Sequence, residues 1–362
     1  MLAVVVSAVI AFVYFAMIAA FTRGLRRVTQ MPKCDTPPNS VSIIVPFHNE
    51  ESTIGQMIES VLAQRTETRF ELIAVDDHSS DKSAQIVSTI AQTDSRLHLT
   101  TSTQRGKKNA LLCGIEQAQS DTIIITDADC TYPPTWINTM TSAFAGECML
   151  LAAPVRIAGI NSLFNKFQFV DFASLVGSGM GAAGCRHPIM CNAANLMFSK
   201  SAFERLNNPL NNSYASGDDV FLLHKFKQAY GDKIRFVFSA DATAETKPAT
   251  SISHFMRQRM RWGGKTPGYT DRDAIAVAFV VAVTNIVLCA DVAIAWWCWV
   301  PAALVYSIKL LIDSIFLKRV CNILGNNRWL WMMPVFEVAV ALYTTIVVIG
   351  IGIRRNPKPE WH

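Results

Sequence analysis

The sequence predicts an α/β domain with a Rossmann-like, mostly parallel sheet and transmembrane helices on its N- and C-terminal sides. Between residues 41 and 127, short runs rich in β-branched residues alternate with helical patterns, the order expected of a parallel sheet with helices on both faces. Long apolar runs lie outside this region, in residues 2–21, 274–308 and 329–353. Runs of this length match the thickness of a bilayer, so the domain is expected beside a membrane.

The overall composition narrows the class of protein. The chain has 362 residues, 51% hydrophobic and 17% charged, and its 33 Lys and Arg against 28 Asp and Glu give a net charge of +5. This is too apolar for a disordered chain, and the charge is too small and scattered to indicate a nucleic-acid partner. The nine cysteines form no Cys-x-x-Cys pair. Reduced cytoplasmic thiols are therefore a simpler interpretation than a zinc site or a disulfide framework.

The first apolar run predicts an N-terminal anchor. Residues 2–21 hold 20 uncharged residues, which form a helix of about 30 Å and match a hydrocarbon core. No basic residue precedes this run, whereas Arg23, Arg26 and Arg27 follow it. Positive charges favour the cytoplasmic side, so the sequence predicts an anchor with its N-terminus outside rather than a cleaved signal peptide.

The C-terminal apolar runs predict two to three further spans. Residues 274–308 contain one charge, Asp291, and are just long enough for a tight hairpin of two short spans. Residues 329–353 form another candidate. The charged residues Glu337, Lys309 and Asp313 are expected to face protein or the interface rather than lipid, as a polar contact between helices rather than a transport pathway.

The charges after the last run conflict with a simple count of spans. One N-terminal and three C-terminal spans would leave Arg354, Arg355 and Lys358 outside, against the preference of basic residues for the cytoplasmic side. Two resolutions remain open at this point: one segment is re-entrant or interfacial, or the tail departs from the preference.

The central region contains the predicted sheet and its connections. Strands are expected near residues 41–47, 71–77, 97–101 and 122–127, with helices near 52–64, 82–92 and 108–118. Ligands of such sheets bind beyond the carboxyl ends of the strands. Asp76 and Asp77 follow the second strand, and Asp127 and Asp129 follow the fourth. This arrangement suits a nucleotide and metal site.

The pair Asp127 and Asp129 is the candidate metal site. Side chains alternate along an extended segment, so residues 127 and 129 are expected on the same side. Hard oxygen ligands of this kind suit Mg²⁺ or Mn²⁺ bound together with a diphosphate. Solvated turn carboxylates are the alternative, because a bare Asp-x-Asp is common.

Other candidate residues each have a structural alternative. Asp77 can accept a hydrogen bond from a nucleobase or ribose, or belong to a helix cap region. Lys107 lies in a Gly-Lys-Lys segment near the expected diphosphate, although the segment lacks P-loop spacing and can be a solvated basic loop. Asp218 and Asp219 begin an amphipathic helix. Two interpretations are open: both carboxylates complement the helix dipole, or one of them is a general base.

Residues 258–262 read Gln-Arg-Met-Arg-Trp and come just before the first C-terminal span. The segment can be a membrane-surface helix. Alternatively, Arg261 reaches a leaving diphosphate while Trp262 stacks on a sugar ring.

Taken together and in this order, the motifs resemble those of a known protein family. The segments VSIIVPFHNE (41–50), VDDHSSD (75–81), GKKNAL (106–111), DADC (127–130), CNAANLMF (191–198), SGDDVFLL (216–223) and QRMRW (258–262) together resemble the membrane-bound family 2 glycosyltransferases over residues 41–265. The resemblance implies a GT-A fold and inverting sugar transfer from a nucleotide donor. It implies these roles: nucleobase and donor contacts by Asp77, Lys107, Asp127, Gln258 and Arg261, a metal on Asp129, catalysis by Asp219 with Asp218, and acceptor contacts by Trp262 and Asn195.

The implied enzyme uses Mg²⁺ or Mn²⁺ as its cofactor. Its expected partners are membrane lipids and an acceptor, which provides a hydroxyl of a lipid or lipid-linked glycan. UDP is the expected nucleotide, with GDP and dTDP as alternatives. A processive polysaccharide synthase is the alternative activity, disfavoured because such enzymes usually have more C-terminal spans, a gating loop or a regulatory domain. A silent nucleotide-binding membrane scaffold is the alternative of another class. The expected location is a bacterial inner membrane with a cytoplasmic catalytic domain.

The expected divisions of the chain follow from these assignments. They are an anchor (1–22), a linker (23–40), the GT-A domain (41–249), an amphipathic interface segment (250–272), a C-terminal transmembrane region (273–353) and a tail (354–362).

Overall fold

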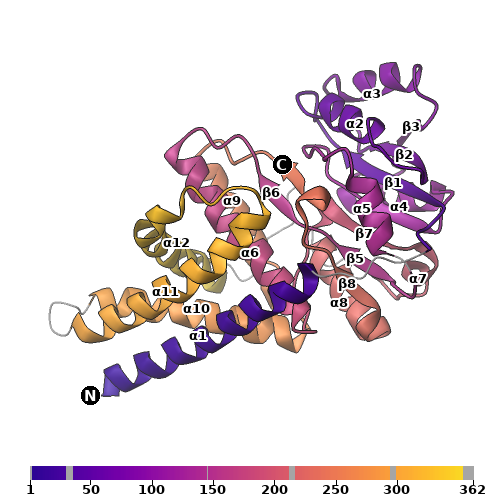
Figure 1. Ribbon diagram of the computed structural model, residues 1–362. Coiled ribbons are helices and arrows are strands. Elements are labelled where there is room, and N and C mark those ends of the chain that lie inside the picture. The colour runs from indigo at the N-terminus through magenta and orange to yellow at the C-terminus, as the bar shows by residue number, and fades with distance from the viewer. Residues whose placement is uncertain (1, 30–35, 145, 212–216, 294–298, 354–362) are drawn as a thin grey trace.

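A seven-stranded sheet forms the centre of the α/β domain (Figure 1). The computed structural model describes residues 2–29, 36–144, 146–211, 217–293 and 299–353. The strand order is β3-β2-β1-β4-β7-β5-β8. The strands are β1 (Ser40–Phe47), β2 (Arg69–Asp76), β3 (Leu97–Thr101), β4 (Thr122–Ile125), β5 (Leu150–Ala152), β7 (Leu196–Ser199) and β8 (Ile234–Phe236).

Strands β1 to β4 pair in parallel, whereas β7 runs antiparallel to both of its neighbours, β4 and β5. Strand β5 pairs in parallel with β8. A second, two-stranded parallel sheet is formed by β6 (Val155–Ile157) and β9 (Ala244–Thr246). The predicted mostly parallel sheet is therefore confirmed. The strand at 97–101 matches its predicted bounds, and β4 ends at Ile125, two residues earlier than expected.

Helices cover both faces of the sheet because each buried strand has two apolar faces. Along β1, Ile43 and Val45 belong to one hydrophobic core and Ile44 to the other, as the alternation of side chains requires. One core includes residues of α2 (Ile54–Leu62) and α5 (Trp136–Ala143), and the other includes residues of α4 (Lys107–Gln117) and α8 (Asp218–Tyr230). The remaining helices of the domain are α3 (Ser83–Ala91) and α7 (Lys200–Glu204).

Within the part of the chain that the structure describes, four helices are long and apolar enough to span a membrane. They are α1 (Leu2–Thr29), α10 (Arg272–Ala293), α11 (Trp299–Ile323) and α12 (Met333–Ile353), the last preceded by the 3₁₀ turn Leu330–Met332. In Figure 1, α1, α10 and α11 extend away from the sheet. The chain is therefore a membrane protein with three candidate spans in its C-terminal region. The tail charges Arg354, Arg355 and Lys358 lie outside the described residues.

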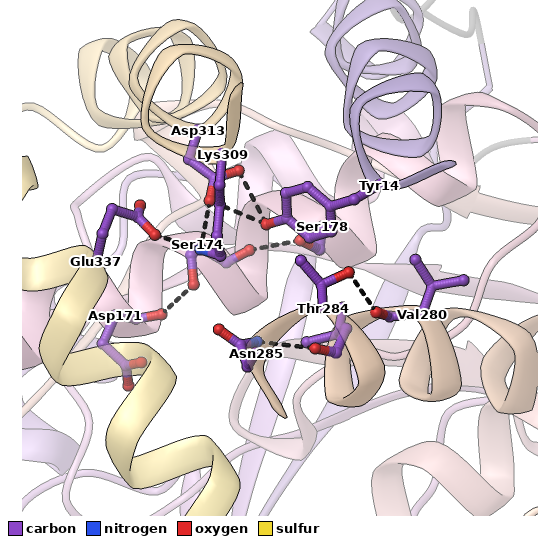
Figure 2. A network of polar contacts seen from close by, with 11 residues as sticks. Tyr14, Asp171, Ser174, Ser178, Val280, Thr284, Asn285, Lys309, Asp313 and Glu337 are labelled. Carbon is purple, nitrogen blue, oxygen red and sulfur yellow. Dashed lines mark hydrogen bonds and ion pairs between the residues drawn. The ribbon is translucent and has the colours of Figure 1, made fainter. Parts of the chain in front are cut away.

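The second C-terminal span is longer than the sequence suggested. A hairpin ending at residue 308 would exclude Lys309 and Asp313, but α11 continues to Ile323 and includes both. The helix can continue because these polar side chains pair with one another. The Lys309 ammonium pairs with Asp313 at 2.7 Å and with Glu337 of α12, and the Tyr14 hydroxyl of α1 donates to Asp313 (Figure 2). The three charged side chains are buried, which confirms that they face protein.

Helix α6 (Leu163–Gly184), which no sequence pattern indicated, joins the domain to the membrane helices. A Cβ atom added at Gly24 of α1 would lie 2.0 Å from the carbonyl oxygen of Gly181, and one at Gly177 would lie 2.4 Å from Val320 of α11. Glycines therefore permit backbone approach closer than any larger residue allows. Helix α9 (Ile252–Gly263) also meets a membrane helix, because Gly263 faces Val347 and Ile351 of α12.

Candidate active site

The carboxyl ends of β2 and β4 bring three acidic residues to one edge of the sheet. Asp77 directly follows β2 and is buried. Its two carboxylate oxygens accept hydrogen bonds from the backbone N–H of Gly106, at 2.8 and 2.9 Å, and the Ser102 hydroxyl lies 3.3 Å away. Asp77 therefore holds the loop in front of α4 in place, and this loop leads directly into Lys107.

Lys107 connects the two acidic motifs. Its ammonium pairs with the Asp127 carboxylate, and a small cavity is lined by Lys107, Asp127, Asp218 and Pro46, among others. Burial alone would lower the pKa of Lys107, but the charges of Asp127 and Asp218 outweigh it and raise the pKa above its usual value. Lys107 is therefore a fixed positive charge between them.

Asp127 and Asp129 lie at a turn, so the extended backbone expected for this segment is wrong. The backbone N–H of Cys130 donates to the carbonyl oxygen of Asp127 at 3.2 Å, which bends the chain just after β4. The Thr246 hydroxyl of β9 donates to Asp129 at 2.9 Å. Burial and the nearby charge of Asp127 raise the pKa of Asp129. The two carboxylates therefore interact unfavourably, and a cation between them would relieve this.

These carboxylates offer the hard oxygen atoms that Mg²⁺ and Mn²⁺ prefer. Within the described part of the chain, no group of three or more His, Cys, Asp and Glu residues could hold a metal ion by itself. A divalent ion at Asp129 would therefore need further oxygen ligands from a substrate or water. The cysteines of the described residues are free thiols.

Asp218 and Asp219 begin α8 in different environments. The preceding Gly217 has φ +99°, a left-handed conformation that glycine adopts without strain. Asp219 accepts a hydrogen bond from the Val220 backbone N–H at 2.7 Å and pairs with Lys265, whose Nζ lies 3.1 Å from Oδ1. Asp218 lies 3.4 Å from the Lys108 ammonium.

The two environments shift the pKa values of Asp218 and Asp219 in opposite directions. Burial would raise the pKa of Asp219, but the Lys265 charge and the Val220 hydrogen bond outweigh it and lower the pKa. Burial raises the pKa of Asp218, although Lys107 and Lys108 oppose the rise. The side chain of Asp219 is 19% exposed against 7% for Asp218. Asp219 is thus the more acidic and more accessible of the pair.

The three expected residues of α9 lie in different surroundings. Trp262 packs against Phe172, with ring centroids 5.8 Å apart, and against the core that contains Cys130. The Gln258 amide oxygen accepts a hydrogen bond from Arg259 at 3.0 Å. Arg261 is exposed. The chain just beyond these residues returns to the base candidate, because Lys265 contacts Asp219.

Asn195 is not brought to the surface of the site. Its side chain is fully buried, its amide nitrogen donates to the carbonyl oxygens of Pro154 and Ala242, and its oxygen accepts from the Trp136 indole at 2.9 Å. An acceptor would have to break these hydrogen bonds to contact Asn195. The geometry therefore indicates a structural role for Asn195 rather than the expected acceptor contact.

Several residues of the site were missed at the sequence level. Lys265, Lys108 and Thr246 contact the predicted acids from other segments, and Arg259 pairs with Asp171 of α6. Lys108 and Arg259 lie within the quoted motifs, which was an available signal. The partners Thr246 and Asp171 come from distant segments, which no local spacing reveals.

Comparison with known proteins agrees with this fold. Residues 42–206 match the model of glycosyl transferase family 2. The chain is 31% identical over 155 residues to an undecaprenyl-phosphate 4-deoxy-4-formamido-L-arabinose transferase of Pectobacterium carotovorum, covering 40% of this chain and 47% of the relative. It is 30% identical over 161 residues to a poly-beta-1,6-N-acetyl-D-glucosamine synthase of Staphylococcus aureus, covering 43% and 39%. The chain thus spans less than half the length of these relatives.

A solved structure resembles nearly the whole chain. The mannosyltransferase PcManGT of Pyrobaculum calidifontis, in complex with GDP-Man and Mn²⁺, superposes with a TM-score of 0.63 at 15% identity, over 98% of this chain and 100% of that one. The chain therefore resembles glycosyl transferase family 2 over residues 42–206 and shares the fold of this structural neighbour, with membrane-type helices at both ends.

Proposed function

We propose that this protein is an inverting glycosyltransferase that moves a sugar from a nucleotide-sugar donor to a hydroxyl of a lipid or lipid-linked acceptor at the membrane. The observation that carries the proposal is the meeting of Lys107, Asp127 and Asp218 around one cavity at the carboxyl edge of the sheet. Asp219 follows Asp218 directly at the start of α8 and pairs with Lys265. Ligands of open α/β sheets bind at this edge.

The donor would lie between the loop held by Asp77 and the turn of Asp127. Asp77 accepts hydrogen bonds from the nucleobase, and Lys107 and Asp127 contact the donor. A diphosphate would draw the Lys107 ammonium away from Asp127, because both present anionic oxygens to it. Gln258 and Arg261 would contact the diphosphate from α9, and the exposure of Arg261 leaves its guanidinium free to reach a ligand.

Asp129 would hold Mg²⁺ or Mn²⁺, with Thr246 orienting its carboxylate. When bound, this ion offsets the negative charge of the diphosphate. The named complex of the structural neighbour with Mn²⁺ supports a divalent ion in this fold.

Asp219 would act as the base. One carboxylate oxygen takes the proton of an acceptor hydroxyl while the acceptor oxygen forms a bond to the anomeric carbon. The bond from that carbon to the diphosphate oxygen breaks, and the electron pair leaves with the nucleoside diphosphate. Lys265 keeps Asp219 ionised and ready to accept the proton. Asp218, which is more buried, supports the site through Lys107 and Lys108. Trp262 offers a ring face to the acceptor.

UDP remains the nucleotide that the resemblance favours, whereas the structural neighbour is complexed with GDP-Man. The two relatives represent the two activities under consideration, since one is named for an undecaprenyl-phosphate acceptor and the other for a polymer. We favour a single transfer. A bacterial inner membrane with the catalytic domain in the cytoplasm is the location we propose, because these relatives are bacterial.

Product analysis tests this proposal. The purified protein in lipid nanodiscs would be incubated with a panel of nucleotide sugars and a lipid extract, and lipid products would be weighed by mass spectrometry. A product heavier than its lipid by one sugar is expected. A ladder of sugar additions would instead establish the processive synthase, and nucleotide binding without any product or nucleotide release would favour the scaffold.

A further inference from the structure

One buried arginine holds both Gln258 and Trp262. Arg259 is 5% exposed, and its Nη1 donates to the Gln258 amide oxygen at 3.0 Å. The centre of its guanidinium lies 4.3 Å from the centroid of the Trp262 ring, a distance at which a cation and an aromatic face attract each other. The positions of these two side chains therefore depend on where Arg259 is held.

Asp171 of α6 holds Arg259. It is 3% exposed, and its Oδ2 accepts from Arg259 Nε at 3.0 Å and from Nη2. Its Oδ1 accepts from the Tyr343 hydroxyl of α12. One carboxylate thus joins three helices, α6, α9 and the membrane helix α12.

Helix α6 continues from Asp171 toward the membrane helices, which bury the polar cluster of Lys309, Asp313 and Glu337. The Ser174 hydroxyl donates to the Asp171 carbonyl oxygen at 2.7 Å, and α6 packs against α11, the helix that carries Lys309 and Asp313 (Figure 2). The position of Asp171 is therefore fixed by the packing of the membrane helices as well as by the α/β domain.

We propose that Asp171 is a positioning residue for acceptor binding, acting through Arg259 to fix Trp262 and Gln258. This inference rests on the proposed function, which gives Trp262 the acceptor contact. Removing the carboxylate charge leaves a buried guanidinium unpaired, which is costly, so Arg259 must move and the ring stacked on it loses its support. In the described structure, the side chain of Asp171 contacts Arg259 and Tyr343 and none of Asp77, Lys107, Asp127 or Asp219.

The test compares Asp171→Asn with Glu71→Gln in full-length protein in nanodiscs. Glu71 is a matched control, because it is a largely buried acid whose carboxylate accepts hydrogen bonds from the Ser42 hydroxyl and the Gln119 N–H. It lies near the N-terminal end of β2, whereas the candidate site lies at the carboxyl end. Acceptor KM, kcat, donor Kd and nucleotide diphosphate release without acceptor would be measured for each.

For Asp171→Asn we expect acceptor KM to rise about 10- to 100-fold. Donor Kd should rise much less, because Gln258 is only one of several donor contacts, and acceptor-independent release should stay within a few-fold of wild type. Glu71→Gln should leave the acceptor KM unchanged. An unchanged acceptor KM in Asp171→Asn, or an equal loss of donor affinity, would overturn the proposal. Wild-type protein that releases nucleotide from no donor would instead contradict the proposed function itself.

Tyr343→Phe provides a second reading if Asp171→Asn does not fold. It removes one hydrogen bond to Asp171 and leaves the ion pair in place, so a smaller rise in acceptor KM is expected with a normal melting curve. A double-mutant cycle of Asp171→Asn with Arg259→Gln should be strongly non-additive in acceptor KM. Additive effects would show that the two residues act independently, against the proposal.

Discussion

Lys265 and Asp219 form an ion pair, with Nζ 3.1 Å from Oδ1, although 46 positions separate them in the chain. Lys265 follows α9 and precedes α10, so the contact joins the segment before the first C-terminal span to the start of α8. The candidate base therefore depends on a segment that belongs to the membrane-facing part of the protein. The close fit at Gly217, where an added Cβ would lie 2.8 Å from the Lys265 side chain, supports a fixed position for this lysine.

Replacing Lys265 by methionine should change the pH dependence of transfer. Activity requires ionised Asp219, so it is present above the pKa of this carboxyl and lost as pH falls through it. Lys265 lowers that pKa. In Lys265→Met the pKa rises, and the acidic limb of the kcat/KM profile should move to higher pH.

Lys233→Met is the control for this profile, because Lys233 pairs with Glu147, whose side chain is 82% exposed. Its acidic limb should match that of wild type. An unshifted limb in Lys265→Met would show that Asp219 is not the group whose ionisation controls the rate.

Asp129→Asn should remove the dependence of transfer on divalent metal. Loss of this ligand removes several kcal/mol of charge stabilisation, or about 10²-fold or more in rate. Thr246→Val should have a smaller effect, weakening metal affinity by about 10- to 100-fold, because it only orients the carboxylate. Titrating Mn²⁺ or Mg²⁺ into the variants measures both effects. Metal activation of Asp129→Asn equal to wild type would refute the assignment.

Gly24→Ala should destabilise the contact between α1 and α6. The added Cβ would lie 2.0 Å from a backbone oxygen of Gly181, so one helix must move away, and overpacking of this kind costs about 1–3 kcal/mol. Gly352→Ala is the matched control, since its Cβ would meet nothing within 4 Å. Thermal melting in the same detergent should separate the two variants, and equal melting temperatures would contradict the close packing.

Lys309→Met should destabilise the membrane bundle strongly. It leaves the buried carboxylates of Asp313 and Glu337 without their cation, and breaking a buried ion pair costs about 3–5 kcal/mol. Lys318→Met on the same helix exchanges an exposed lysine and should be nearly neutral. The triple variant Lys309→Met, Asp313→Leu, Glu337→Leu should recover much of the loss. Denaturant unfolding in micelles measures each, and a stable single variant would show that the cluster is solvated.

The strands and the acidic motifs were predictable because their signals are local. Runs such as 41–47 are buried on both faces and therefore mostly apolar. Asp77 directly follows β2, and Asp127 comes two residues after the end of β4. Helix α6 was missed because it packs on several sides and so lacks a single apolar stripe, while its many glycines read as poor helix formers.

The contacts that were missed have distant partners. Asp171 and Arg259 are 88 positions apart, and Thr246 reaches Asp129 from a strand paired in the second sheet. Asn195 was assigned to the acceptor because it lies in a motif, whereas its neighbours in space, Trp136, Pro154 and Ala242, use its whole amide.

The central claim is that Asp219 is the base of a metal-dependent sugar transfer. The most direct test is nucleotide diphosphate release from a panel of nucleotide sugars by wild type and Asp219→Asn in nanodiscs, with and without Mn²⁺ or Mg²⁺, beside donor binding. We expect metal-dependent release with one donor, lowered about 10²- to 10⁴-fold in Asp219→Asn while donor Kd is nearly unchanged. Turnover retained in Asp219→Asn would contradict the account.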